Sequence, residues 1–111
     1  MRQNSFLIIT KIKDYIKLID GYVANILKKD LYIKNKIYNT SFDLIEKVFE
    51  LNETDIKKER HLLLAKLNTL DFLFEFLYCK KYISSKQLEK NAYKLLEINK
   101  MIGAWLKKYE C

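Results

Sequence analysis

The chain has 111 residues, of which 50% are hydrophobic and 32% charged, and it carries a formal net charge of +7. This balance suits one soluble globular domain over residues 1–111, and no stretch approaches the roughly 18 uncharged apolar residues of a membrane span. The chain has no proline and two glycines, which disfavours a fold rich in tight β-turns and favours an all-α fold.

The first half of the chain predicts two amphipathic helices. One runs from about Phe6 to Lys28, with Gly21 on its polar side and its apolar residues within an arc of about 140° on a helical wheel. This arc consists of Ile8, Ile9, Ile12, Tyr15, Ile16, Ile19, Tyr22, Val23, Ile26 and Leu27. The second runs from about Tyr32 to Leu51, and its apolar residues cover about half of the circumference. These are Ile33, Ile37, Tyr38, Phe42, Leu44, Ile45, Val48 and Phe49.

A third helix is predicted from about Asp55 to Lys81, after an N-cap at Asn52 or Thr54. Its apolar residues, among them Phe72 and Phe76, surround almost the whole axis. A narrow polar strip holds His61, Asn68, Asp71 and Glu75. A single four-helix bundle needs only one apolar stripe from each helix, and monomers rarely expose large apolar patches. The excess of apolar surface therefore predicts a homo-oligomer.

A fourth helix is predicted from about Ser85 to Lys108, because Ser84 and Gln87 have the spacing of a capping box. Four long helices with short connections favour an antiparallel up-down four-helix bundle. On the wheel, Gly103 lies near Ala92 and Asn99, which predicts a small-residue seam where a neighbouring helix approaches closely. Trp105 lies at the edge of the core, where its ring is buried and its N–H finds a partner.

The residues that carry catalytic chemistry are few. His61 is the one histidine, and its side chain diverges by about 100° from that of its neighbour Arg60. Asp71 and Glu75 share a helix face but have no second histidine for a metal site. The chain also lacks the glycines of a phosphate-binding loop. We expect no enzyme, no cofactor and no metal; a small RNA-cleaving bundle would rest on His61 and basic charge alone.

Cysteine use and the first residues of the chain bear on its compartment. Cys79 and Cys111 form no metal-binding or disulfide framework, which fits a reduced cytoplasmic compartment. No small-residue cleavage site follows the first apolar run, so no signal peptide is expected.

Lysines form an ordered stripe on the fourth predicted helix, within an arc of about 140°. The stripe consists of Lys86, Lys90, Lys94, Lys100, Lys107 and Lys108. Such a stripe can contact the phosphates of a nucleic acid without reading its bases, and Tyr93 within it can stack on a base. Glu89 and Glu97 share the arc, and the alternative is an ordinary solvated helix face.

Residues 62–108, which begin LLLAKLNTLDFL and end KMIGAWLKK, resemble the Avd family, the accessory proteins of diversity-generating retroelements. The family ends on a Glu, an apolar, a small and a basic residue, then an apolar pair, Gly-Gly-Trp and basic residues. Here that segment runs from Glu97 to Lys108, with Ala104 in place of the second glycine. The Avd family belongs to a wider four-helix group, which includes proteins encoded in ribosomal-RNA intervening sequences.

The resemblance implies a four-helix protomer that assembles into a basic, pentameric barrel. It implies a bacterial or phage-encoded protein without a catalytic site, which binds a reverse transcriptase and its template RNA, or an RNA/DNA hybrid, during mutagenic cDNA synthesis. The family usually has arginines on its third helix where this chain has Asp71 and Glu75. These carboxylates, with His61, are expected to face a partner. A scaffold or antitoxin-like module without a nucleic-acid role is the alternative.

Overall fold

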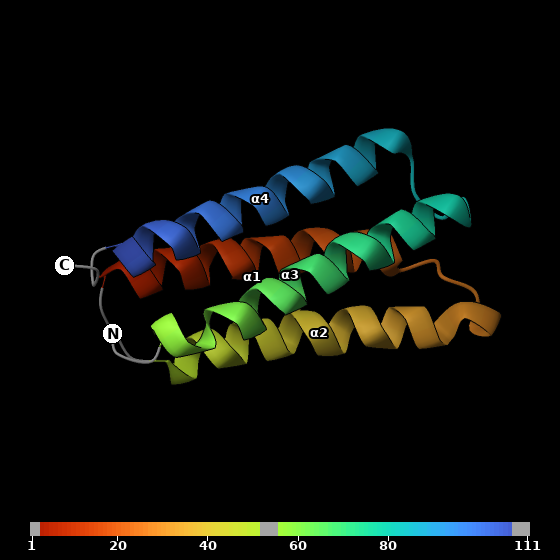
Figure 1. Ribbon diagram of the computed structural model, residues 1–111. Helices are drawn as coiled ribbons and strands as arrows, with labels where there is room; N and C mark the ends of the chain where they lie inside the picture. The colour runs from red at the N-terminus through yellow and green to blue at the C-terminus, as the bar shows by residue number, and fades with distance from the viewer. Residues whose placement is uncertain (1–2, 52–55, 108–111) are drawn as a thin grey trace.

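The computed structural model of the chain describes residues 3–51 and 56–107. These residues form four long helices, α1 (Gln3–Val23), α2 (Leu31–Glu50), α3 (Ile56–Cys79) and α4 (Ser85–Lys107), and a short 3-10 helix, η1 (Lys28–Asp30). Figure 1 shows the four helices side by side, with the α1–α2 and α3–α4 connections at the same end of the molecule. The predicted all-helical bundle is confirmed.

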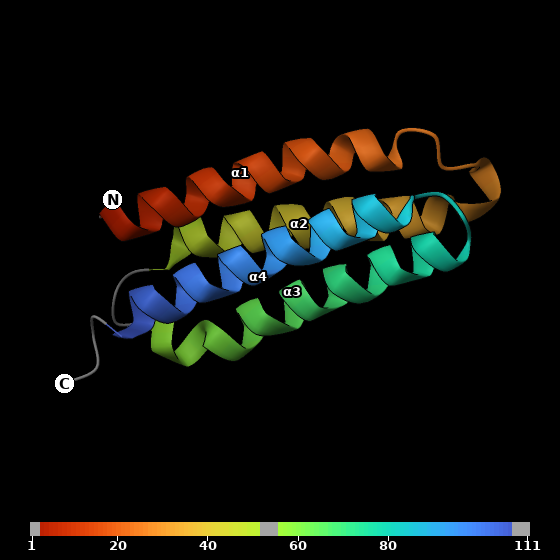
Figure 2. The same ribbon diagram turned by 90° about the horizontal axis from the view of Figure 1, so that it is seen from above.

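Each long helix packs against two others. Helices α1 and α3 both contact α2 and α4, so the four helices enclose a common core (Figure 2). The protein measures 48 × 23 × 20 Å. This elongated shape follows from the helix length, because twenty residues of α-helix span about 30 Å.

The core is built from residues of the apolar stripes that were predicted on helical wheels. In α1 the buried residues are Ile8, Ile9, Ile12, Tyr15, Ile19 and Val23. Leu44 of α2, Leu70 and Phe74 of α3 and Ile102 of α4 are fully buried in the same core. Each such side chain stabilises the fold by about 1.5–3 kcal/mol relative to its exposed state. The hydrophobic spacing therefore identifies the inner face of α1 correctly.

The end of the first helix was predicted wrongly. Helix α1 ends at Val23 rather than near Lys28. The N–H of Ile26 donates to the carbonyl of Val23 over 3.3 Å in a turn, and Leu27 has extended backbone with φ −70° and ψ 156°. The helical spacing of Ile26 and Leu27 conceals this break in the sequence. The chain has to turn here because α2 packs back against α1.

A buried carboxylate ties the two connections at this end together. Asp30 accepts a hydrogen bond from the hydroxyl of Tyr82 over 2.5 Å, and Lys80 lies 3.1 Å from its other oxygen. The N–H of Leu27 in turn donates to the Tyr82 hydroxyl over 3.4 Å. The Tyr82 hydrogen bond, and secondarily Lys80, hold the pKa of Asp30 below its ordinary value of 3.8. The same hydrogen bond raises the pKa of Tyr82 above its ordinary value of 10.0.

We expect stability to fall at both extremes of pH. Because the folded-state pKa of Asp30 is lowered, its contribution is complete above about pH 4 and is lost as pH falls through the lowered pKa. Because the pKa of Tyr82 is raised, its contribution is lost as pH rises through that raised value. Thermal unfolding at a series of pH values measures this dependence of stability on pH. At pH 7, Asp30→Asn should lower the melting temperature by roughly 5 °C. An unchanged melting temperature in Asp30→Asn would contradict the role of this contact.

The start of α4 agrees with the predicted capping box. The N–H of Ser84 donates to the side-chain oxygen of Gln87 over 2.9 Å, and the N–H of Gln87 donates to the hydroxyl of Ser84 over 3.1 Å. These two bonds satisfy backbone donors that a helix start leaves free. They fix the residue at which α4 begins, and the lysines that follow are therefore held at helical spacing. The N-caps proposed for α3, Asn52 and Thr54, lie outside the described residues.

Candidate functional site

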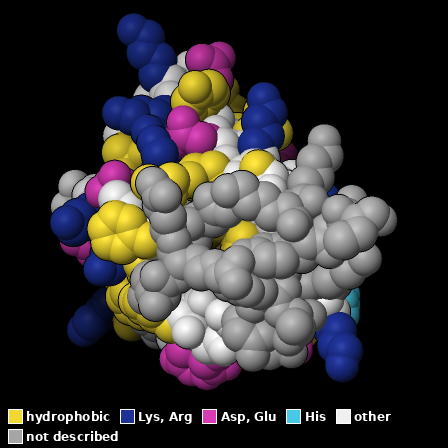
Figure 3. Space-filling model, turned by 90° about the vertical axis from the view of Figure 1, so that its left-hand side faces the viewer, with side chains coloured by type: hydrophobic (Ala, Val, Ile, Leu, Met, Phe, Trp, Pro, Cys, Tyr) yellow, Lys and Arg dark blue, Asp and Glu magenta, His cyan; other side chains and the backbone are white. Residues whose placement is uncertain are grey.

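The lysine stripe lies on the outer side of α4. Lys86, Lys90 and Lys100 are exposed, and Lys94 is half-buried. Figure 3 shows Lys and Arg side chains projecting at the top of the molecule, the height of α4 in Figure 1, with carboxylates among them. Lys107 is the last residue of α4, but its side chain and all of Lys108 lie outside the described residues.

The neighbouring helix adds a lysine to this stripe. Lys11 of α1 lies 3.3 Å from the Glu97 carboxylate, so one of the two acidic residues in the arc is paired with a cation of another helix. Tyr93 is 62% exposed in the same arc. The basic surface therefore extends from α4 towards α1. Sequence reasoning missed Lys11 because a wheel treats each helix alone.

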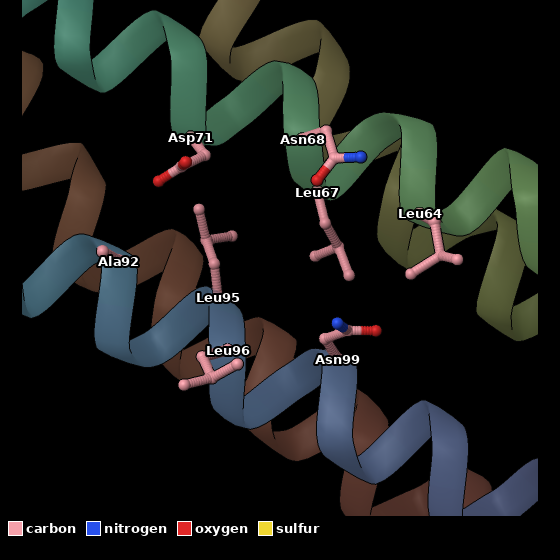
Figure 4. A pocket seen from close by; sticks show the side chains of 8 residues that line it. All are labelled: Leu64, Leu67, Asn68, Asp71, Ala92, Leu95, Leu96 and Asn99. Carbon is pink, nitrogen blue, oxygen red and sulfur yellow. The ribbon is translucent and has the colours of Figure 1, made fainter.

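A groove of about 300 Å³ separates the outer edges of α3 and α4. Figure 4 shows Leu64 and Leu67 extending from α3 towards α4, and Leu95 extending from α4 towards α3. Leu64 and Leu67 of α3 and Leu95 and Leu96 of α4 line the groove together with Asn68, Asp71, Ala92 and Asn99. The four residues of the predicted polar strip on α3 therefore do not share one environment. Asn68 and Asp71 border the groove, whereas His61 and Glu75 are exposed elsewhere on α3.

A buried polar pair lies in the core between α1 and α4. The hydroxyl of Tyr15 donates to the side-chain oxygen of Asn91 over 2.7 Å, and both side chains are buried. Burial, and secondarily the charge of Asp71, raise the pKa of Tyr15 well above its ordinary value. The Asn91 amide nitrogen has no acceptor among the described residues. Sequence reasoning missed Asn91, although it has the spacing of the core positions Leu88 and Leu95.

The small-residue seam does not bring helices of this chain together. A Cβ added at Gly103 would meet no atom within 4 Å among the described residues, and Ala92 is exposed. The close contact expected at Gly103 is not found within the described residues.

We expect Gly103→Ala to stabilise the isolated protomer. The added methyl group has open space, and alanine in a helix is favoured over glycine by about 0.5–1 kcal/mol. Chemical denaturation should show this gain, while Gly21→Ala, which also has open space around its Cβ, provides the matched control. A loss of stability in Gly103→Ala alone would contradict this expectation.

Of the three aromatic residues expected to serve packing or assembly, Trp105 is buried, Phe76 is half-buried and Phe72 is exposed. Trp105 is 2% exposed, as predicted, but its indole nitrogen has no acceptor among the described residues. Phe72 is 60% exposed and stacks on the half-buried Phe76 with 6.1 Å between ring centroids. The Lys80 nitrogen lies 5.3 Å from the Phe76 ring centroid. An apolar face of α3 therefore stays uncovered in the protomer.

Other groups that could carry chemistry are dispersed. His61 is exposed and Arg60 half-buried, and the described residues contain no cluster of three or more His, Cys, Asp or Glu side chains. Cys79 is exposed. None of the helices in the described ranges is long and apolar enough to cross a membrane.

Comparison with known proteins gives no significant match to a family model, to a curated protein or to a solved structure.

Proposed function

We propose that this protein is a non-catalytic accessory subunit of a diversity-generating retroelement, which binds the reverse transcriptase and its template RNA in the cytoplasm. The observation that carries the proposal is the lysine stripe on the exposed side of α4, in the segment that resembles the Avd family. Lysine ammonium groups on one rigid helix neutralise successive phosphates, and this contact needs no particular base sequence.

The uncovered face of α3 supports a role in an assembly. Phe72 presents its ring to solvent and stacks on the half-buried Phe76, and aromatic side chains of this kind anchor protein interfaces. We propose that the protomer is an antiparallel up-down bundle that assembles through this face into a homopentameric barrel. Asp71 and Glu75 would then meet basic residues of the polymerase, in place of the arginines of relatives.

The RNA-binding half of the proposal is tested with the purified full chain and a fluorescently labelled structured RNA. We expect binding that weakens steeply between about 50 and 200 mM salt, because each neutralised phosphate releases counterions. Absence of binding at the lower salt concentration would contradict an RNA-binding role.

The polymerase half is tested by copurification. The tagged chain, expressed beside its neighbouring genes, should recover a reverse transcriptase that mass spectrometry identifies. Recovery of a toxin or scaffold protein without a polymerase would favour the alternative, a scaffold or antitoxin-like interaction module. Asp71 in the α3–α4 groove favours that alternative, because the family has basic residues at these positions.

A further inference from the structure

The end of the bundle that carries the α1–α2 and α3–α4 connections is rich in lysine. We define this connection end as residues 27–34 and 78–82, which contain five lysines and one carboxylate, that of Asp30. Asp30 is buried and is paired with Lys80 over 3.1 Å. The acidic residues that come next on the long helices lie about one turn or more inside the connections; they are Asp20, Asp43, Glu75 and Glu89. The five lysines are Lys28, Lys29, Lys34, Lys80 and Lys81.

Four large apolar side chains are exposed at the same end. Leu27, Leu31, Tyr32 and Tyr78 are 57%, 43%, 61% and 43% exposed. Single exposed residues of this kind are common, but here they flank the lysines in two short segments, LKKDLY and YCKKY. The hydrogen bond from Tyr82 to Asp30 joins the two segments, which Figure 1 shows at one end of the bundle. Lysines and apolar side chains therefore share one surface.

Lys81 occupies a backbone position that is unfavourable for lysine. The N–H of Tyr82 donates to the carbonyl of Leu77 over 3.0 Å, and the N–H of Lys81 donates to that of Tyr78 over 2.9 Å. These two bonds form the Schellman motif that ends α3. Lys81 has a φ of 69°, in the left-handed region, where this motif usually has glycine. The chain carries a lysine there at a cost in stability, which indicates a use for its ammonium group.

A membrane surface fits this combination of side chains better than a nucleic acid does. The phosphates of RNA would attract the lysines, but Leu27 and Leu31 neither pair with phosphates nor stack on bases. On a bilayer with anionic lipids, lysines meet the headgroups, while leucine and tyrosine side chains enter the boundary between headgroups and acyl chains. The connection end is also a narrow end of a bundle 48 Å long, so it can meet a flat surface.

We propose that the connection end binds the surface of a bilayer that contains anionic lipids, with its lysines at the headgroups and its leucines and tyrosines among them. The long helices then stand away from the membrane, and the lysine stripe of α4 stays open to solvent. The inference does not rest on the proposed RNA-binding function, because the residues of the connection end lie outside that stripe.

Cosedimentation of the full chain with lipid vesicles tests the proposal. Vesicles of phosphatidylcholine with about one third phosphatidylserine should bind the chain at about 50 mM salt, and the binding should weaken at about 0.5 M salt. Vesicles of phosphatidylcholine alone should bind far less. Absence of binding to the anionic vesicles at the lower salt concentration, or equal binding to both kinds of vesicle, would overturn the proposal.

Charge removal locates the binding surface. Lys28→Gln combined with Lys29→Gln should weaken binding to the anionic vesicles roughly twentyfold, because each lysine near such a surface contributes about fivefold. Lys13→Gln combined with Lys17→Gln removes the same charge from exposed positions midway along α1 and should change binding little. Equal losses in the two double variants would mean that net charge, and not the connection end, attracts the vesicles.

Lys81→Gly separates binding from folding. Glycine suits the positive φ at this position, so the variant should melt at a higher temperature than the wild-type protein. It should nevertheless bind the anionic vesicles about fivefold more weakly, because one lysine is lost from the surface. Unchanged vesicle binding in this variant would contradict the role inferred for Lys81.

The apolar side chains distinguish a membrane from a nucleic acid. Leu27→Ser combined with Leu31→Ser should weaken vesicle binding roughly tenfold and leave the binding of labelled RNA unchanged. Leu96→Ser, which changes a similarly exposed leucine on the side of α4, should leave vesicle binding unchanged. If the connection-end variants instead lose affinity for RNA and not for vesicles, this end binds nucleic acid and the proposal is wrong.

Discussion

Replacing Lys86, Lys90 and Lys100 together with glutamate is expected to weaken RNA binding roughly 100-fold at moderate salt. These three side chains are exposed on α4, and reversing them removes three attractions and adds three repulsions along one helix face. The slope of log affinity against log salt should also become shallower by about two units, since fewer counterions are released. Titration of labelled RNA at several salt concentrations measures both effects.

A variant of equal net charge separates the stripe from the general basicity of the protein. Lys13→Glu, Lys17→Glu and Lys58→Glu change three exposed lysines outside α4. If net charge alone attracts RNA, both triple variants lose the same affinity. A loss confined to the α4 variant supports the stripe, whereas equal losses would contradict it.

Much of the bundle follows from local patterns in the sequence. Ile12 and Ile19 recur at helical spacing and are fully buried, and the pair Ser84 and Gln87 forms the expected capping box. These features are predictable because each depends on residues within one or two turns of the same helix. The exposed lysines of α4 follow from the same argument.

Features that depend on two helices were not predictable in this way. The wheel of α2 groups Leu44 with Phe42 as apolar, but only the packing of neighbouring helices buries Leu44 and leaves Phe42 exposed. The early end of α1 likewise accompanies the contact between Asp30 and Tyr82, which lie far apart in the sequence. Gly103 was assigned a packing role from its size, whereas the space around it depends on the other helices.

The hydrogen bond between the buried side chains of Tyr15 and Asn91 is expected to contribute strongly to the stability of the bundle. This bond of 2.7 Å joins α1 to α4 in a core that is otherwise mainly apolar. A buried hydroxyl without a partner costs about 1–3 kcal/mol, and a shortened side chain also leaves a cavity. Asn91→Ala does both, so we expect it to lower the free energy of unfolding by roughly 2–4 kcal/mol.

A double-mutant cycle separates the hydrogen bond from the packing around it. Asn91→Leu keeps a branched side chain, though a larger one, and leaves the Tyr15 hydroxyl unpaired, whereas Tyr15→Phe leaves the Asn91 side-chain oxygen unpaired, so each should cost about 1–3 kcal/mol. The combined variant leaves neither of these two groups unpaired and should lose less stability than the sum of the two single losses. Urea denaturation at neutral pH measures all four proteins. If the two losses simply add in the combined variant, the contact between Tyr15 and Asn91 does not stabilise the bundle.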